Sequence, residues 1–144
     1  MIVVVSIIGL IVGVSYPSIS AGLDSVRMTS ATDSVAAFLN GAVTRAQRRQ
    51  RPVELVVSTR DNLLALYSSE AGYHRELRMP DGIVIEAVLP APEGIPDEVR
   101  RFLIVPGGIA PSVGIQLANK RDGHRLVKLD PMTGFPHVEA VNTK

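Results

Sequence analysis

The stretch MIVVVSIIGLIVGVSYPSISAGL, residues 1–23, contains no charged side chain, and the first charge in the chain is Asp24. The run MIVVVSIIGLIVGV has no polar face, and a helix of that kind must be surrounded by lipid or by protein. At about 1.5 Å per residue, a helix over this stretch extends roughly 34 Å, which is enough to cross a hydrocarbon core of about 30 Å. We therefore expect a membrane-spanning helix at the N-terminus.

Three simpler interpretations compete: a cleaved signal peptide, a buried core helix and a plain single-span anchor. A signal peptide has a positively charged start and a small-x-small cleavage site, and neither is evident here. A chain of 144 residues is small for enclosing a fully apolar helix. Gly9 and Gly13 stand four residues apart, a spacing that lets two helices approach closely. Pro17 is expected to bend the helix rather than end it, because a helical pattern resumes after it.

From residue 24 to residue 51 the pattern becomes amphipathic. Polar residues occupy the other faces, and Pro52 is expected to stop the helix at Arg51. Apolar residues recur at the spacing of one helix face, and they are Val35, Phe38, Leu39, Ala42, Val43 and Ala46. We expect this stripe to lie on a globular domain formed by residues 52–144.

After Pro52 the period changes to that of strands, which are separated by turns rich in Gly, Pro and Asp. The expected strands are 53–58, 63–68, 73–78, 83–89, 99–105, 113–119, 125–130 and 135–141. Short strands at this spacing favour an antiparallel sheet. The predicted fold class is α+β, with a long bent helix packed on antiparallel sheet.

Composition and motifs argue against an enzyme. The chain has no Cys, which excludes disulfides and thiolate metal sites, and its three His residues lack the spacing of metal ligands. No nucleophile elbow and no phosphate-binding loop is present. Asp61, Asn62 and Asp122 could ligate Ca²⁺, but turn chemistry is the commoner role for such residues. We expect no cofactor and no metal.

An arginine cluster ends the helix, formed by Arg45, Arg48, Arg49 and Arg51. Cations are favourable at a helix C-terminus, so the arginines are expected to contact carboxylates or solvent there. The other possibility is that they contact phosphates of DNA or a partner. No aromatic residue lies among them in the sequence, which disfavours stacking of bases.

The chain resembles the type IV pilin-like superfamily in MIVVVSIIGLIVGVSYP, where Gly9 and Pro17 fall at the family's positions. The segments AVTRAQRRQRPVELVVS and RFLIVPGGIAPSVGIQLANKRDGHRLVKLDPMTGF are similar to the GspH/FimT family of minor pseudopilins and pilins. The leader peptide, its Gly cleavage site and the Glu of the superfamily are not in this sequence. That fits either an internal Met taken as the start or a trimmed chain.

The resemblance implies a minor pseudopilin, a structural subunit of the type II secretion pseudopilus that helps export folded proteins. It implies a single span in a bacterial inner membrane with the globular domain in the periplasm. The partners would be other pseudopilins or pilins, an inner-membrane assembly platform and membrane lipid. The alternative is a minor type IV pilin that binds DNA for uptake. The residues expected to face lipid or neighbouring subunits are Ile2, Val5, Ile8, Gly9, Val12, Gly13, Tyr16 and Pro17.

Overall fold

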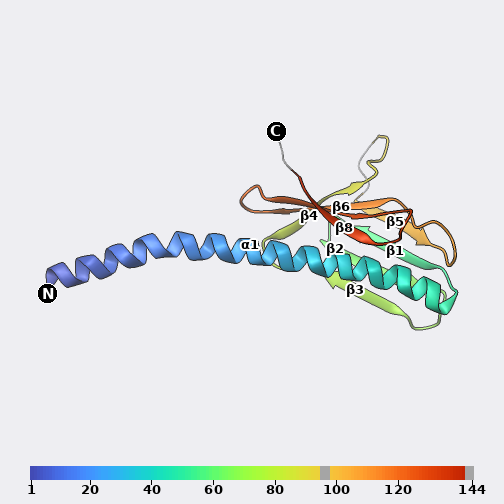
Figure 1. Cartoon of the computed structure of the whole chain (residues 1–144), viewed down its shortest axis with the longest axis horizontal. Coiled ribbons are helices and arrows are strands. Elements are labelled where there is room, and N and C mark those ends of the chain that lie inside the picture. The colour runs from blue at the N-terminus through green and yellow to red at the C-terminus, as the bar shows by residue number, and fades with distance from the viewer. Residues whose placement is uncertain (95–97, 142–144) are drawn as a thin grey trace.

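The computed structural model describes residues 1–94 and 98–141, apart from the side chains at positions 17 and 18. One helix, α1 (Ile2–Arg49), precedes all the strands, as Figure 1 shows. The strands are β1 (Val53–Ser58), β2 (Leu63–Ser68), β3 (His74–Arg78), β4 (Ile83–Leu89), β5 (Val99–Ile104), β6 (Val113–Asn119), β7 (His124–Leu129) and β8 (Pro136–Ala140). The predicted α+β fold is confirmed, with a long helix packed on antiparallel sheet.

Helix α1 runs without interruption from its first turn to Arg49 and ends two residues earlier than predicted. Gln50 adopts a left-handed conformation, with φ of 53°, and its side-chain amide donates to the Gln47 carbonyl at 2.6 Å. A left-handed residue ends a helix on its own, so the chain has already turned before Pro52. The bend expected at Pro17 stays a prediction, because that side chain lies outside the described residues.

The second half of α1 buries one stripe, and all six predicted stripe residues are buried. The stripe also begins earlier than predicted, since Met28 and Ala31 are buried too. It forms one hydrophobic core with residues of strands from both sheets, such as Leu55 of β1 and Ile115 of β6. Packing against this core, more than helix propensity, stabilises the second half of α1.

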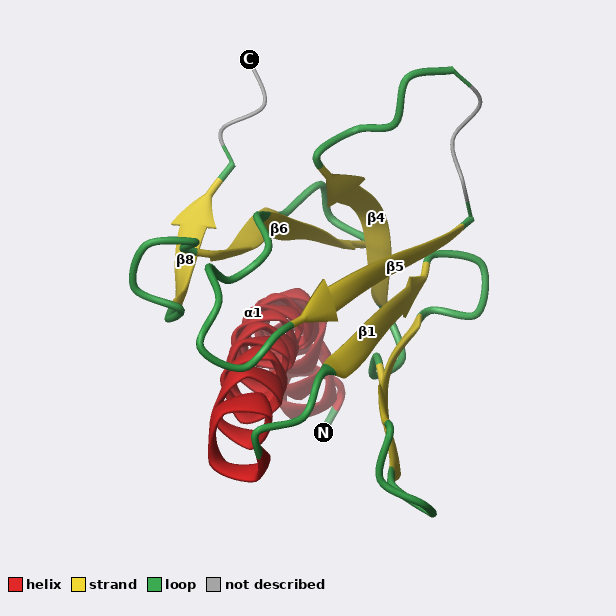
Figure 2. Ribbon diagram, turned by 90° about the vertical axis from the view of Figure 1, so that its right-hand side faces the viewer, coloured by secondary structure: helices red, strands yellow, loops and turns green. Residues whose placement is uncertain are grey.

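The eight strands form two antiparallel four-stranded sheets. The first has the order β3-β2-β1-β5 and the second the order β4-β6-β7-β8. Figure 2 looks close to the helix axis and shows the strands gathered on one side of α1, which contacts strands of both sheets. The division into two sheets was not predicted from the sequence.

A β-bulge in β4 changes which residues face the core. The pairing with β6 shifts between Ile85 and Ala87, so the buried positions change from Ile83 and Ile85 to Val88. An extra residue at a bulge reverses the alternation of side chains along a strand. The extra residue, Glu86, is thereby left to make polar contacts at the surface of the second sheet.

Asn62, in the turn between β1 and β2, ties the two sheets together. Its side-chain amide donates to the Ile83 carbonyl at 2.7 Å and its amide oxygen accepts from the Ile85 N–H at 2.7 Å. Its backbone φ of 56° is in the left-handed region, which Asn tolerates better than most residues. The turn therefore both reverses the chain and docks on the edge of β4.

Candidate functional site: the free half of the helix and the arginine groove at its end

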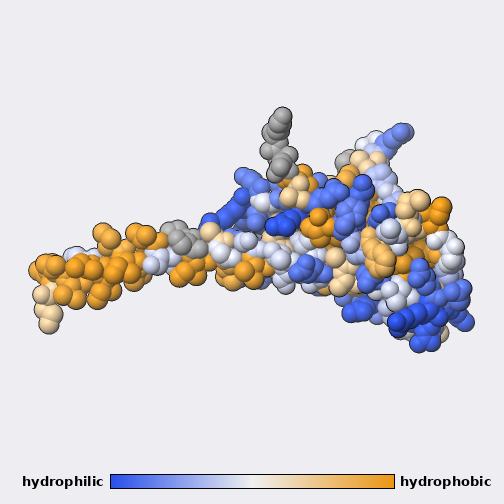
Figure 3. Space-filling model, viewed as in Figure 1, coloured by the Kyte–Doolittle hydropathy of each residue, from blue (hydrophilic) through white to orange (hydrophobic). Residues whose placement is uncertain are grey.

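The first half of α1 extends away from the globular domain as a free rod (Figure 1). Its apolar side chains are exposed on every side, including Ile2 at 84% and Val12 at 60%. Figure 3 shows hydrophobic residues along the length of this rod. Among the described residues, α1 is the one helix whose length and composition suffice to span a membrane. Residues 2–16, which we call the rod, are all exposed, so no described residue of the globular domain covers them.

The predicted lipid-facing and subunit-facing residues all lie on this rod. Ile2, Val5, Ile8, Val12 and Tyr16 are exposed. Their spacing places these five on one side of the helix. Ile7, Leu10 and Val14, on the opposite side, are exposed as well, so the rod is apolar beyond the predicted side. A surrounding solvent that is apolar on all sides suits such a helix.

Gly9 and Gly13 have no structural role inside the chain. A Cβ built at either position would meet no atom within 4 Å, and neither residue has a positive φ. Glycine inside a helix costs about 1 kcal/mol relative to alanine. The two glycines leave two shallow places on the surface of the rod where another helix can approach closely.

The rod leaves the domain at an ion pair between Arg121 and Asp24. Arg121 Nε lies 3.1 Å from the Asp24 carboxylate, and its Nη2 donates to the Ser20 hydroxyl at 2.9 Å. Asp24 is also the first charge in the sequence. The ion pair therefore lies at the boundary between the uncharged part of the helix and the part that packs on the globular domain.

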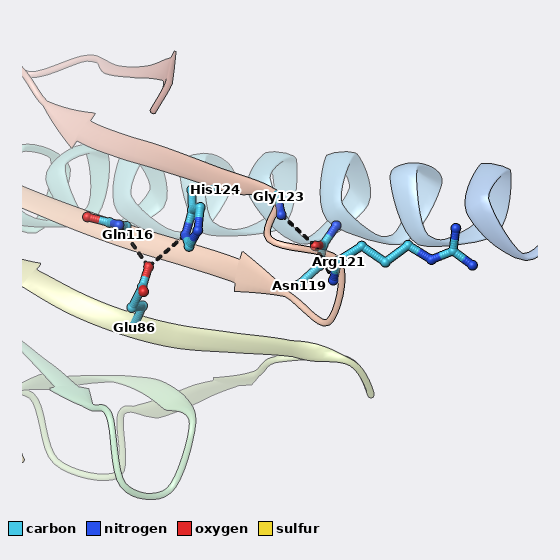
Figure 4. A network of polar contacts seen from close by, with 6 residues as sticks. All are labelled: Glu86, Gln116, Asn119, Arg121, Gly123 and His124. Atoms are coloured by element: carbon cyan, nitrogen blue, oxygen red, sulfur yellow. Dashed lines mark hydrogen bonds and ion pairs between the residues drawn. The ribbon is translucent and has the colours of Figure 1, made fainter. Parts of the chain in front are cut away.

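The turn that carries Arg121 is organised by Asn119, as Figure 4 shows. The Asn119 side-chain oxygen accepts from the Arg121 N–H at 2.9 Å and from the Gly123 N–H at 2.8 Å. A Cβ at Gly123 would come within 2.8 Å of the Asn119 side chain, so a larger residue there would displace Asn119 from these hydrogen bonds. Asp122, between them, has φ of 56°. Asp122 thus has a turn conformation, as the sequence indicated.

Next to this turn, Glu86 joins two strands of the second sheet (Figure 4). Its carboxylate accepts from Gln116 Nε2 at 2.8 Å and lies 2.8 Å from His124 Nδ1. Glu86 is the extra residue of the bulge in β4. Within residues 1–94 and 98–141, no group of three His, Asp or Glu side chains could hold a metal ion.

The arginine cluster lies at the other end of α1, where the Glu70 carboxylate faces two of its arginines, Arg45 and Arg49. Arg45 Nη2 is 2.6 Å from the Glu70 carboxylate, and Arg49 Nη1 is 4.0 Å from it. The Arg45 guanidinium also lies over the Tyr73 ring, 3.3 Å from its centroid. These contacts are of the kind expected if the arginines bind carboxylates. Arg48 and Arg51 are exposed.

Two residues beside the arginine cluster were not predicted from the sequence to be part of this site. Tyr73 and Arg75 line one groove with Arg45, Arg48 and Arg49. Alternate residues of a strand share a face, so Arg75 lies on the same side as Tyr73 and Leu77, which both pack on the core. That alternation was visible in the sequence, but the approach of this strand to the helix end was not.

No protein-family model, curated protein or solved structure matches this chain.

Proposed function

We propose that this chain is a minor pseudopilin, a structural subunit of the type II secretion pseudopilus. It is held in the inner membrane by the first half of α1 and is then drawn into a short periplasmic fibre. The observation that carries the proposal is the free rod, whose apolar surface is exposed on all sides of the helix.

The physical logic is an exchange of neighbours. In the membrane the rod is surrounded by acyl chains, and in the fibre by the same segments of other subunits. Because both surroundings are apolar, the transfer has little hydrophobic cost, and close packing decides whether helices associate. Gly9 and Gly13 favour that packing, since they open the surface of the helix without serving any contact in the chain.

The position of the first charges supports the same arrangement. A charged pair is costly in the hydrocarbon region, so Asp24 and Arg121 belong at the membrane surface or beyond it. The side chains that precede Asp24 are all uncharged. The globular domain then stands directly on the membrane surface, on the side that the resemblance makes periplasmic.

The resemblance supplies the partners in this proposal. They are other pseudopilins of the same fibre, the inner-membrane assembly platform and membrane lipid. The globular domain is held rigidly on the second half of α1 by the buried stripe. A pull on the helix is therefore transmitted to the whole domain, which is what insertion of a subunit into a fibre requires.

Cysteine crosslinking tests the proposal cleanly, because the chain has no native Cys. The Ile8→Cys variant, expressed in bacterial inner membranes, is expected to form disulfide-linked dimers on mild oxidation. The Ser69→Cys variant, with its thiol on an exposed loop of the domain, is the matched control and is expected to stay monomeric. A solely monomeric product from the Ile8→Cys variant would argue against fibre packing through the rod.

A further inference from the structure

We propose that the groove between the C-terminal end of α1 and strand β3 is a docking site for an acidic segment of a partner protein. The groove has a volume of about 530 Å³. Helix residues from Ala37 to Arg49 form one wall, and Tyr73 and Arg75 form the other. It lies at the end of the domain opposite to the free rod.

The groove concentrates positive charge in a chain whose net charge is only +1. Four guanidinium groups line it, those of Arg45, Arg48, Arg49 and Arg75. Among the described residues, only one carboxylate, that of Glu70, forms ion pairs with them. The excess of positive charge is therefore local, and it favours a ligand with several negative charges.

Much of the hydrogen-bonding capacity of these arginines is unused. In the part of the chain that the structure describes, the side chains of Arg48 and Arg75 have no hydrogen bond or ion pair. Arg45 Nε is buried and has no hydrogen-bond partner, although Nη2 of the same group is bound to Glu70. The Arg45 Nε atom has almost no exposed surface, so the donors open to a ligand in the groove are mainly those of Arg48 and Arg75.

One guanidinium is already held in place for binding. Arg45 is fixed between the Tyr73 ring and the Glu70 carboxylate, so little freedom is lost when a ligand binds. Guanidinium groups bind carboxylates through paired N–H donors, a geometry that lysine cannot provide. A cluster made entirely of arginine therefore fits a carboxylate-bearing protein segment.

The aromatic residues of this region disfavour a nucleic acid as the ligand. One face of Tyr73 is covered by Arg45, and Tyr67 is stacked on His74 at 4.8 Å between centroids. Single strands are held mainly by stacking of bases on free aromatic faces. The next residue on the same face of β3 as Arg75 is Leu77, which is apolar and packs on the core, so the positive surface does not continue along the strand as a long backbone track would require.

The inference goes beyond the proposed function, because binding in the groove does not require the fibre. The groove is formed by residues of one chain, at the far end from the rod. Failure of crosslinking through the rod would therefore leave this proposal standing, and absence of peptide binding would leave the fibre proposal standing.

The test is fluorescence anisotropy with the full chain in a non-ionic detergent at low salt. The probe is a labelled hexapeptide of Asp and Glu, and the comparison peptide has Asn and Gln in their place. We expect the acidic peptide to bind and the neutral peptide not to bind. The Arg48→Gln/Arg75→Gln variant is expected to bind the acidic peptide about tenfold more weakly.

The matched control is the Arg60→Gln/Arg101→Gln variant. It removes the same charge from two exposed arginines on the turn after β1 and on β5, at the opposite edge of the same sheet. We expect its affinity for the acidic peptide to be unchanged. Equal loss in both variants, equal binding of the two peptides, or no binding would overturn the proposal. Tighter binding of duplex DNA than of the acidic peptide, lost in the groove variant, would overturn it in favour of a phosphate ligand.

Discussion

At the scale of single residues, Gly9 and Gly13 carry the clearest signal for contacts outside the chain. Each has open space where a side chain would be, so neither is explained by the fold of the monomer. Added to the Ile8→Cys crosslinking variant, the Gly9→Leu/Gly13→Leu pair should reduce disulfide formation several-fold, because bulky side chains hold the helices apart. Thermal unfolding of the globular domain should be unchanged. An undiminished crosslink would show that the helices do not approach through these glycines.

Asn62 is the residue on which the joint between the two sheets depends. The Asn62→Ala variant loses two hydrogen bonds and places alanine at positive φ, and we expect the free energy of unfolding to fall by about 2–3 kcal/mol. The Asn62→Gly variant separates the two causes, because glycine accepts the backbone conformation. Urea unfolding of both variants should place Asn62→Gly between wild type and Asn62→Ala. Equal stability of all three proteins would contradict this role.

Asp130 begins the turn between β7 and β8 and gives a pH-dependent contribution to stability. The Met132 N–H, which donates to the Asp130 carboxylate at 2.8 Å, lowers the pKa of this carboxyl below 3.8. Because the folded-state pKa is lowered, the ionised group stabilises the fold above the unfolded-state pKa. This contribution is lost as the pH falls through the lowered folded-state pKa.

The Asp130→Asn variant should therefore have a lower Tm than wild type at pH 7, and the difference should narrow as the pH falls below about 4. Thermal unfolding followed by circular dichroism from neutral to acidic pH measures this. Asp81→Asn, in the exposed turn before β4, controls for the removal of one surface charge. A Tm difference that is constant with pH would contradict the role of the carboxylate.

At the scale of elements, the two halves of helix α1 have different surroundings: the first half is exposed and the second half packs on the domain. Replacing a leucine by alanine in each half distinguishes them. Leu39 is fully buried, and the Leu39→Ala variant should lower the free energy of unfolding by about 3 kcal/mol through the cavity it leaves. Leu10 is 69% exposed, and Leu10→Ala should leave the unfolding of the domain in detergent unchanged. Similar effects of both substitutions would mean that the rod is part of the folded domain.

The elements were largely predictable because their signals are local. Strands β1, β2, β4 and β6 begin and end at the predicted residues, and the others differ by one residue at one or both ends. Alternation of apolar residues and turns rich in Gly, Pro and Asp carry this information. The end of α1 was placed two residues late, because the left-handed turn at Gln50 has no marker such as glycine.

The pairing of the strands could not be predicted in this way. Strand β5 returns to pair with β1 across an intervening sequence that contains three other strands. Such pairing depends on the global packing of the core, which no local pattern encodes. The bulge at Glu86 could not be predicted for the same reason, because an extra residue in one strand is defined only by the pairing with the neighbouring strand.

At the scale of the whole molecule, the apolar rod could be predicted from the sequence, whereas the ion pair at its end and the arginine groove could not. The apolar rod is continuous in the sequence, so its charge-free composition was sufficient to find it. The ion pair that ends it joins Asp24 to Arg121, and the groove joins the helix end to β3. These contacts are made by segments distant in sequence, and only the fold brings them together.

The central claim is that the rod, and not the globular domain, holds this molecule in a membrane. The full chain and its Val12→Lys variant, which places a charge in the middle of the apolar stretch, are reconstituted with lipid vesicles by removing detergent. A charge at the centre of a span costs about 3 kcal/mol of insertion free energy. The Val12→Leu variant controls for the change in side-chain size.

The decisive measurement is flotation of these vesicles in a density gradient at neutral pH and high salt, which keeps the lysine charged and strips proteins that bind the surface only through charge. We predict that the full chain and the Val12→Leu variant float with the lipid and that the Val12→Lys variant floats less. Recovery of the full chain as a lipid-free monomer at the bottom of the gradient would contradict the claim.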